Sequence, residues 1–491
     1  MKTENFANTS HSFTKHELVR ILDACLNKTL GEVDVNHVFD KTKTSPKIKG
    51  IAGDVIEQSV LGYPADNRQE PDLVVDGEYV ELKTTGIEYE KKGKPFTYKA
   101  KEPMSITAVS PHIIVFEEFE DSNFWHKLAK MLIVYYLYNS KQKVYAADYA
   151  KFPIKGYQFH EFSEEDAAIL KREWSLVRDF IRSLQRDYED YESQYPRLSS
   201  ELRRDLFYID TAPKWPNPPR FRLKRSVVTT IVQKHFGARF DQLPHSYSTF
   251  SEIEAECNRN AKKFYNKTID EIAIWFGFKQ ATYHKSIAER IVVNMFGGKA
   301  KKMHEIELFS KIGILGKNVI LSPKGEHTED MKLFPIDFDE IQDLNVTFEE
   351  SSFYNFFASH QFLYIIFKED VKGSPVGETR FQGFKRYQFT EKFIHEYVRP
   401  VWERVRHLVV NKELIDVIEY NKDGTPRINK TGVIKSAPNF PKKTNGPIFV
   451  RGSGTDSTKK TFELNDIKMY VQWLWISGAQ IDKILDGEKF I

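Results

Sequence analysis

The stretch Pro71–Thr85, PDLVVDGEYVELKTT, contains two short apolar runs on either side of Asp76-Gly77. Both residues of this dipeptide tolerate positive φ, so it favours a tight turn between two antiparallel strands. Side chains two residues apart on a strand share a face, which places Glu81 and Lys83 together. Asp72 opens the partner strand. The sequence therefore predicts a hairpin on which two carboxylates and an ammonium group converge.

A further carboxylate, Glu57, lies in the upstream segment GIAGDVIEQSVLG, whose apolar residues recur with helical spacing. Gathered carboxylates bind hard cations such as Mg²⁺. A metal held in this way activates water and stabilises phosphate charge. A charged edge of a half-exposed hairpin is the alternative interpretation of the same pattern. A fourth polar group aimed at the same place favours a divalent-metal nuclease site.

The composition limits the class of protein. The chain has 491 residues, of which 41% are hydrophobic and 14% aromatic, so two or three domains with real cores are expected. The net charge is +3, which means that any basic surface is local. The two cysteines, Cys25 and Cys257, supply neither a disulfide framework nor a structural zinc site.

The sequence also bears on the compartment. Its start lacks the apolar core of a signal peptide, and no apolar run is long enough to span a bilayer. We therefore expect a bacterial cytoplasmic protein without a membrane partner.

Segments of the first half recur in the second half in the same order. The matched pairs are NKTLGEV at 27 with NKTIDEI at 266, IAGDVI at 51 with IAERIV at 287, VELKTTGI at 80 with IELFSKIGI at 306, SNFWHKLAK at 122 with SFYNFFAS at 352, the helices bearing Trp174 and Trp402, and DTAPKWP at 210 with KSAPNFP at 435. Six weak matches in unbroken order predict two copies of one fold, at residues 1–240 and 246–491.

The two copies differ where the chemistry is expected. Val293 replaces Glu57, Asp72 has no counterpart, and Lys83 becomes Phe309, although Glu81 matches Glu307. His126 and Lys127 become Asn355 and Phe356. The second copy is therefore predicted to bind or position something without catalysing a reaction.

The sequence resembles the MutH-type endonucleases, which comprise the strand-nicking enzyme of mismatch repair and GATC-cutting type II restriction enzymes. The residues that carry the resemblance are Glu57, Asp72, Glu-Leu-Lys at 81–83, Trp-His-Lys-Leu at 125–128, FRLKRSVVTTIVQKHF at 221–236 and TLGEV at 29–33. A doubled chain is similar to the larger restriction enzymes, whose second MutH-like copy lacks the metal site and is an additional, allosteric DNA-binding module.

The resemblance implies an α/β fold in each half, with a mixed sheet flanked by helices. It also implies Mg²⁺-dependent cleavage of double-stranded DNA at GATC. Asp72 and Glu81 would ligate Mg²⁺, with Glu57 supporting a second metal or the water network. Lys83 would orient or deprotonate the attacking water, and His126 with Lys127 would contact phosphate. No other cofactor is expected. For His126 and Lys127, a solvent-facing pair is the alternative.

Residues that contact DNA are predicted in two basic segments. The first lies where the family's DNA-reading region falls, and phosphate contact is expected for most of its members, with Lys214 the candidate for base contact. These candidates are Lys214, Arg220, Arg222, Lys224 and Arg225 in the first copy, and Lys442, Lys443 and Arg451 in the second. A solvated face is the alternative for the second segment.

The leading hypothesis is a type II restriction endonuclease stimulated by a second recognition site bound by the C-terminal copy. A mismatch-repair-type GATC nickase and a non-cleaving DNA-binding protein are the alternatives. A palindromic target needs two active sites, so one active copy per chain predicts transient self-association on DNA. A cognate DNA methyltransferase is expected only as a genetic partner.

Overall fold

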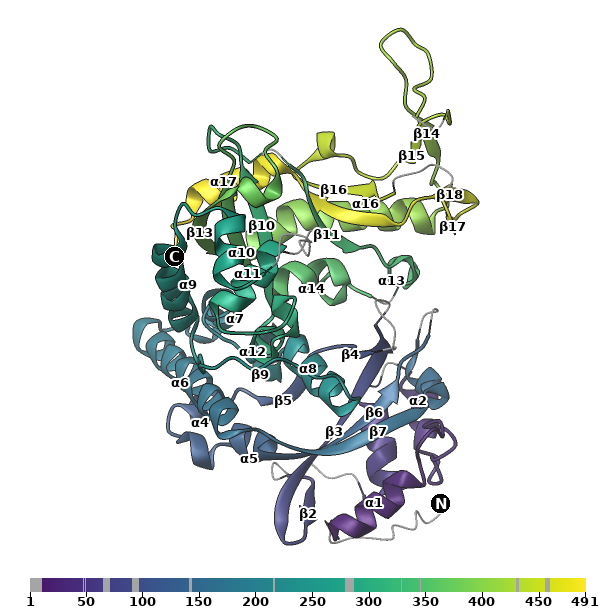
Figure 1. Ribbon diagram of the computed structural model, residues 1–491. Coiled ribbons are helices and arrows are strands. Elements are labelled where there is room, and N and C mark those ends of the chain that lie inside the picture. The colour runs from purple at the N-terminus through teal and green to yellow at the C-terminus, as the bar shows by residue number, and fades with distance from the viewer. Residues whose placement is uncertain are drawn as a thin grey trace. The chain divides into compact units, whose positions relative to one another are not determined.

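The computed structural model describes residues 11–46, 48, 50–64, 71–90, 97–140, 144–214, 217–278, 287–327, 329–344, 346–429, 432–454 and 460–491 (Figure 1). The chain forms two compact units. Unit 1 comprises Met1–Ser140, Val144–Glu252 and His304–Gly313, and unit 2 comprises Lys141–Lys143, Ile253–Met303 and Ile314–Ile491. Each unit contains a mixed sheet flanked by helices, which confirms the predicted α/β class. No helix in the described residues is long and apolar enough to cross a membrane.

Unit 1 is built around a mixed sheet in the order β1-β2-β3-β6-β7, with β4 paired to β3. Strand β6 is parallel to β3 and antiparallel to β7. The strands are β1 (Ser12–Phe13), β2 (Leu73–Val75), β3 (Glu78–Tyr89), β4 (Tyr98–Ala100), β5 (Met104–Ala108), β6 (Lys130–Leu137), β7 (Ile154–Glu161), β8 (Ile209–Lys214) and β9 (Asn217–Leu223). The helices are α1 (Lys15–Asp23), α2 (Lys41–Thr44), α3 (Ile51–Val55), α4 (Pro111–Ile114), α5 (Asn123–Ala129), α6 (Glu164–Asp187), α7 (Pro196–Leu202), α8 (Arg225–His235) and α12 (Glu307–Ile312).

The β2–β3 hairpin forms at the predicted turn. Asp76 and Gly77 have φ of 49° and 87°, the positive values that a two-residue hairpin turn requires. Strand β3 then continues for twelve residues, from Glu78 to Tyr89, between β2 and β6. The stretch Pro71–Thr85 therefore places Glu81 and Lys83 in the centre of the main sheet.

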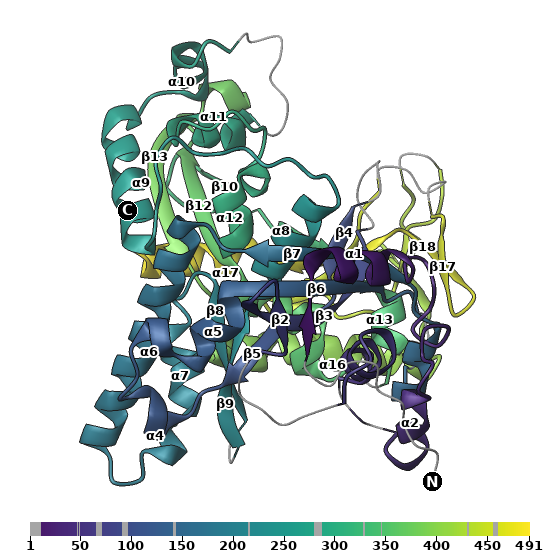
Figure 2. The ribbon, with the colours of Figure 1, turned by 90° about the horizontal axis from the view of Figure 1, so that it is seen from below.

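Apolar side chains attach helices to the main sheet. Leu18 and Leu22 of α1 and Val55 of α3 are fully buried in one cluster with β-strand residues such as Leu132. Helix α1 crosses in front of β6 and β7 in Figure 2. Burial of such side chains provides most of the stability of an amphipathic helix. The packing of α3 matters for the site, because Glu57 lies immediately after this helix.

A smaller antiparallel sheet, β5-β9-β8, presents the segment predicted to contact DNA. A buried carboxylate, Glu173 of α6, fixes its base by accepting hydrogen bonds from the backbone N–H groups of Phe207, Tyr208 and Ile209. Burial raises the pKa of Glu173, which three backbone donors and the charge of Lys224 partly offset. The hairpin β8–β9 is thereby anchored to α6.

Helix α12 belongs to unit 1, although the chain reaches it only after residues of unit 2. Its side chains Phe309 and Ile312 are fully buried. Lys234 of α8 donates to Glu307 at 2.7 Å, and Lys311 donates to Asp166 at 2.8 Å. This packing differs from the predicted division of the chain near residues 240–246, because ten later residues complete unit 1.

The ion pairs of α12 predict an acid-dependent stability. Burial alone would raise the pKa of Glu307, but hydrogen bonds from Lys234 and Lys311 and the charge of Lys311 lower it to about 2. Because the pKa of Glu307 is lower in the folded chain, its negative charge stabilises the fold at pH values above 4.5, the pKa in the unfolded chain. This stabilisation is lost as the pH falls toward 2. We expect Glu307→Gln to lower the unfolding temperature of unit 1 at neutral pH, and the difference from the unaltered chain to shrink as the solution is acidified. Equal differences at all pH values would contradict this assignment.

Unit 2 contains a three-stranded sheet, β10-β12-β13, and a second one, β11-β19-β16. The strands are β10 (Ile314–Leu321), β11 (Met331–Pro335), β12 (Gln361–Lys368), β13 (Arg380–Tyr387), β14 (Asp416–Ile418), β15 (Ser436–Pro438), β16 (Ile448–Gly452), β17 (Phe462–Leu464), β18 (Ile467–Met469) and β19 (Gln472–Ile476). The helices are α9 (Phe250–Phe264), which begins in unit 1, α10 (Ile269–Trp275), α11 (Ile287–Met295), α13 (Phe338–Gln342), α14 (Ser352–Ser359), α15 (Glu391–Phe393), α16 (Arg399–Val410) and α17 (Gly478–Gly487). One large apolar cluster joins α14 and α16 to both sheets.

The strand pairing of unit 2 follows that of unit 1. Strand β12 is parallel to β10 and antiparallel to β13, as β6 is to β3 and β7. Thr29 and Thr268 make matching capping interactions with Glu32 and Glu271. Asn27 and Asn266, two residues before these threonines, have φ of 65° and 61°. These shared details support the sequence repeat.

One of the sequence matches is wrong. Residues 307–312, which were aligned with the strand containing Glu81, form helix α12 and belong to unit 1. By strand pairing, the counterpart of β3 is β10, with the sequence ILGKNVIL. This strand contains no acidic residue, so Glu307 is not the equivalent of Glu81.

Candidate active site

Glu81 lies at the centre of a small polar cluster on β3. Its side chain is only 2% exposed and accepts hydrogen bonds from two ammonium groups. Lys83 donates to one carboxylate oxygen, and Lys127 of α5 donates to both oxygens at 3.0 Å. Strand alternation puts Lys83 beside Glu81, and the parallel pairing of β3 with β6 positions α5, which leads directly into β6. A buried carboxylate is thus held between two cations.

Asp72 approaches the same cluster from the preceding strand. Its carboxylate accepts a hydrogen bond from the backbone N–H of Leu82 at 3.0 Å, which fixes it next to Glu81. Burial raises the pKa of Asp72, and the nearby charge of Glu81 raises it further, while Lys83 and Lys127 oppose the shift. The structure therefore brings Asp72, Glu81 and Lys83 together, as the pattern predicted, and adds Lys127, which only the resemblance had named.

Glu57 lies on a π-helical turn, Ile56–Val60, that follows α3. A side chain at Gly53 would meet both Thr84 Oγ1, at 3.6 Å, and Glu57 Oε1, at 3.9 Å, so this turn packs closely on β3. Burial raises the pKa of Glu57 to about 7, with further contributions from the charges of Asp72 and Asp54. Wide helical turns of this kind often occur at functional sites.

The carboxylates are candidate ligands for a divalent cation. Carboxylate oxygens are hard ligands of the type that Mg²⁺ prefers, and three carboxylates that influence one another's charge fit such an ion. Among the described residues, however, no group of three His, Cys, Asp or Glu side chains stands ready to hold a metal. In the present arrangement the oxygens of Glu81 are bonded to Lys83 and Lys127. The ligand set Asp72, Glu81 and Glu57 stays a prediction.

His126 is less closely associated with the cluster than its neighbour Lys127. It lies exposed on α5 and interacts electrostatically with Glu117. The sequence also gave no signal for His11, whose Nδ1 lies 3.0 Å from the backbone oxygen of Asp72 and whose ring stacks on Tyr63. Because His11 and Asp72 are far apart in sequence, no local spacing could have revealed this contact.

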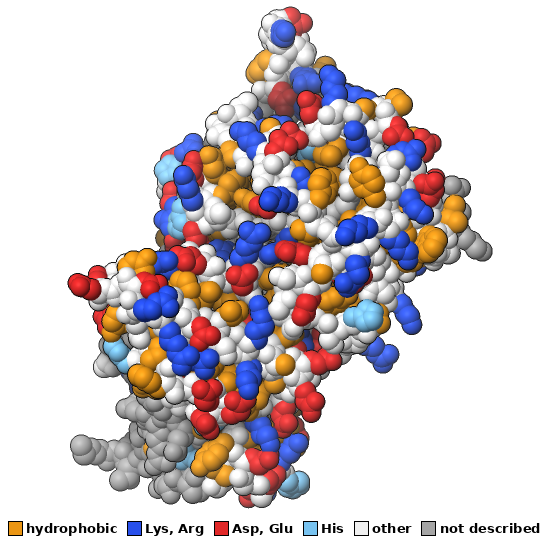
Figure 3. Space-filling model, turned by 90° about the vertical axis from the view of Figure 1, so that its left-hand side faces the viewer, with side chains coloured by type: hydrophobic (Ala, Val, Ile, Leu, Met, Phe, Trp, Pro, Cys, Tyr) orange, Lys and Arg blue, Asp and Glu red, His pale blue; other side chains and the backbone are white. Residues whose placement is uncertain are grey.

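The predicted DNA-contacting residues of unit 1 occupy different environments. Arg220 is exposed. Arg222 donates two hydrogen bonds to the carboxylate of Asp210 on the neighbouring strand, at 2.7 and 3.0 Å. Arg225 donates to the backbone oxygen of Ala100, so much of its bonding capacity serves the fold. On the face shown in Figure 3, basic and acidic side chains are interspersed, which agrees with the small net charge.

Lys224 and Lys214 differ from the other candidates of unit 1. Lys224 is buried and donates to the backbone oxygen of Leu206, while burial lowers its pKa to about 8. This position contradicts the prediction that Lys224 contacts DNA, and the residue instead anchors the β8–β9 hairpin. The side chain of Lys214 lies outside the described residues.

The basic residues predicted in unit 2 are close to one acidic group. Lys443 and Arg451 both donate to Asp330, at 2.7 and 2.6 Å, and Lys442 is exposed nearby in sequence. About half of the side-chain surface of Lys443 and Arg451 stays accessible, at 48% and 46%. These side chains are therefore available to an anionic partner while Asp330 fixes their positions.

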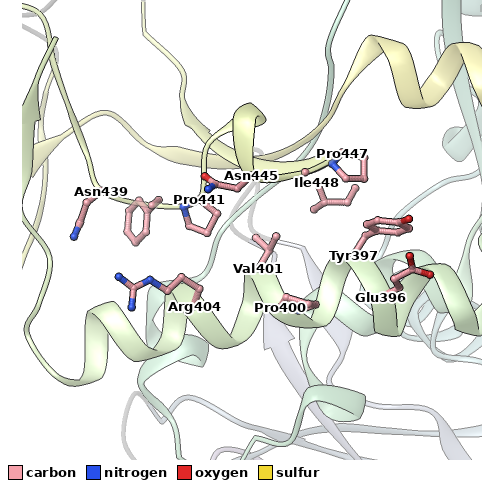
Figure 4. Close-up of a pocket in the computed structure, with 12 residues that line it drawn as sticks. Glu396, Tyr397, Pro400, Val401, Arg404, Asn439, Pro441, Asn445, Pro447 and Ile448 are labelled. Atoms are coloured by element: carbon pink, nitrogen blue, oxygen red, sulfur yellow. The ribbon is translucent and has the colours of Figure 1, made fainter. Parts of the chain in front are cut away.

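A cavity of about 450 Å³ in unit 2 lies between the helical segment 396–404 and residues 439–448 (Figure 4). Proline, valine, isoleucine and aromatic side chains form much of its lining. Arg404 lies toward one end, near Asn439, and Glu396 lies toward the other. Only one carboxylate lines the cavity, so the cluster around Glu81 in unit 1 is the stronger candidate for an active site.

The mixed sheet that carries Asp72, Glu81 and Lys83, with Glu57 beside it, agrees with the restriction-endonuclease-like fold that the resemblance implies. Residues 61–173 match the family described as DNA mismatch repair enzyme MutH. The chain is also similar to the type II restriction enzyme Sau3AI of Staphylococcus aureus, with 24% identity over 472 residues that cover 89% of this chain and 92% of that enzyme. These similarities support a MutH-like type II restriction endonuclease and confirm the resemblance stated from the sequence.

Proposed function

We propose that this protein is a type II restriction endonuclease that hydrolyses double-stranded DNA at GATC in a Mg²⁺-dependent reaction. The observation that carries the proposal is the cluster of Asp72, Glu81, Lys83 and Lys127, which lies inside the segment that matches MutH. The similarity to a restriction enzyme over nearly the whole chain supports cleavage as the outcome.

In this proposal Asp72 and Glu81 would hold Mg²⁺, and Glu57 would support a second metal or the water network. A bound Mg²⁺ would supply charge that stabilises phosphate and lowers the pKa of water. Lys83 would orient the attacking water or take its proton. Lys127, with His126, would place positive charge near the phosphate, where the transition state gains negative charge. Lys214, Arg220, Arg222 and Arg225 stay the candidates of unit 1 for contacts to DNA.

We infer that unit 2 binds a further segment of DNA and does not cleave it. Strand β10 lacks an acidic residue, and Val293, the match of Glu57, is fully buried. Phe356 stands in α14 where α5 has Lys127. Loss of these polar groups while the strand pairing is kept supports a regulatory role for unit 2.

Digestion of unmodified plasmid DNA by the purified protein with Mg²⁺ tests the proposal. Double-strand fragments ending at GATC, formed without helper proteins, are the expected result. Nicked circles alone would favour a mismatch-repair-type enzyme, and binding without cleavage would favour a DNA-binding protein. Plasmids with one and with several GATC sites would show whether a second site stimulates cleavage.

The partners follow from this proposal. Two chains would associate transiently on a palindromic site, since the described part of each chain contains one candidate active site. We also propose a bacterial cytoplasmic location and a cognate DNA methyltransferase as the genetic partner. Digestion of adenine-methylated and unmethylated DNA would show which modification protects the host.

A further inference from the structure

The sheet β11-β19-β16 of unit 2 has two tryptophans on one face of its central strand. Leu474 and Ile476 of β19 point into the apolar core and are almost completely buried. The alternating residues Trp473 and Trp475 therefore point to the opposite face, where both are partly exposed. Two large aromatic side chains on the outer face of a sheet require an explanation beyond the core.

The tryptophans occupy the positions that Arg220 and Arg222 occupy in unit 1. Strand β9 lies between β5 and β8 and is followed by α8, and β19 lies between β11 and β16 and is followed by α17. In both sheets the two outer strands are antiparallel to the central one. Lys224 directly precedes α8, and Ser477 directly precedes α17. Arg222 and Trp475 each lie two residues before these positions, and Arg220 and Trp473 each lie four residues before them.

Cationic side chains flank the tryptophans on both neighbouring strands. Lys332 of β11 is paired with Trp475 in the register, and its Nζ lies 3.6 Å from the ring centroid of Trp473. Arg451 of β16 is paired with Trp473, and its guanidinium lies 4.9 Å from the ring centroid of Trp475. Lys443 lies on the same side as Arg451, and both donate to Asp330. The face is therefore aromatic and carries cationic side chains on both neighbouring strands.

This chemistry differs from that of an arginine-bearing face. Arginine recognises guanine through paired hydrogen bonds in the major groove, and an indole ring has only one donor and no acceptor. Aromatic side chains on a sheet instead stack on bases that are not paired, while neighbouring cations contact the phosphates. Stacking accepts every base, so such a face does not select a sequence.

We propose that the outer face of β11-β19-β16 binds DNA with unpaired bases, and that Trp473 and Trp475 stack on successive bases. Lys332 and Arg451 neutralise the phosphates on either side. The inference rests on the proposal that unit 2 contacts DNA, and it specifies the form of that DNA as single-stranded or locally opened.

Binding of a fluorescent oligothymidylate to the full-length protein, in buffer without divalent metal, tests the inference. We expect Trp473→Ala/Trp475→Ala to weaken this binding about tenfold or more, because each stacked base contributes substantially. Trp473→Phe/Trp475→Phe should retain most of the affinity, since phenylalanine still stacks. Trp275→Ala is the matched control, because Trp275 is 59% exposed in the same unit and also lies beside lysines.

The unaltered chain provides a second measurement that does not depend on the folding of a variant. An unlabelled single strand should displace the oligothymidylate at much lower concentration than a blunt duplex of equal length. Equal competition by the duplex, or unchanged affinity in a folded alanine variant, would overturn the inference. Plasmid cleavage by the same variants separates this result from the proposed nuclease activity, which depends on unit 1.

Discussion

Alanine in place of Lys83 is expected to reduce cleavage of plasmid DNA by about 10³-fold, the range for loss of a group that positions or deprotonates a nucleophile. The fold should tolerate the change, because Lys127 still donates to both oxygens of Glu81 at 3.0 Å. DNA binding should change only a few-fold, since one ammonium group is a small part of a DNA interface. The measurements are the initial rate of plasmid cleavage with Mg²⁺ and the affinity for the same DNA without metal.

Lys99→Ala is the matched control for this experiment. Lys99 also pairs with a glutamate on β3, Glu88, but lies outside the cluster around Glu81. The Lys99→Ala variant should cleave plasmid DNA at close to the rate of the unaltered protein. If Lys83→Ala retained full activity, the assignment of the active site to β3 would be wrong, whatever the DNA affinity of the two variants.

Alanine in place of Glu173 is expected to have the largest effect on stability. The change leaves the backbone N–H groups of Phe207, Tyr208 and Ile209 without their buried acceptor and removes the negative charge near Lys224. Removing one member of such a buried polar group costs about 3–5 kcal/mol. Since unit 1 has the size of a large domain, its thermal transition should fall by about 10 °C.

Glu164→Ala provides the comparison, because Glu164 is on the same helix but exposed in its first turn. Its effect should stay below about 1 kcal/mol, as for most surface changes. Cleavage by Glu173→Ala well below its melting temperature would report whether the β8–β9 hairpin still engages DNA. A melting temperature equal to that of Glu164→Ala would contradict the anchoring role of Glu173.

The sequence predicted those parts of the site that depend on local pattern. The Asp76-Gly77 turn and the alternation along β3 were sufficient to bring Asp72, Glu81 and Lys83 together. Contacts over long distances in sequence were predicted less well. The docking of Lys127 on Glu81 was not predicted from the pattern, because it depends on the parallel pairing of β3 and β6.

The errors have a common physical cause. Lys224 belongs to the basic segment where the family's DNA-reading region falls, which predicts a contact to DNA, but the side chain is buried, and a carboxylate and a backbone oxygen in the interior compensate its burial. The segment 306–314 was matched to a strand on its residues, yet packing of Phe309 and Ile312 against unit 1 makes it a helix. In both cases tertiary contacts decided what residue type alone could not.

The late return of the chain to form α12 has a consequence for synthesis in the cell. A ribosome releases residues 1–252 first, then residues 253–303, and only afterwards the ten residues that finish the nuclease unit. At about 5–20 residues per second, the growing polypeptide remains for several seconds without part of its interior. A translation product that ends before residue 304 would therefore lack the helix that completes unit 1.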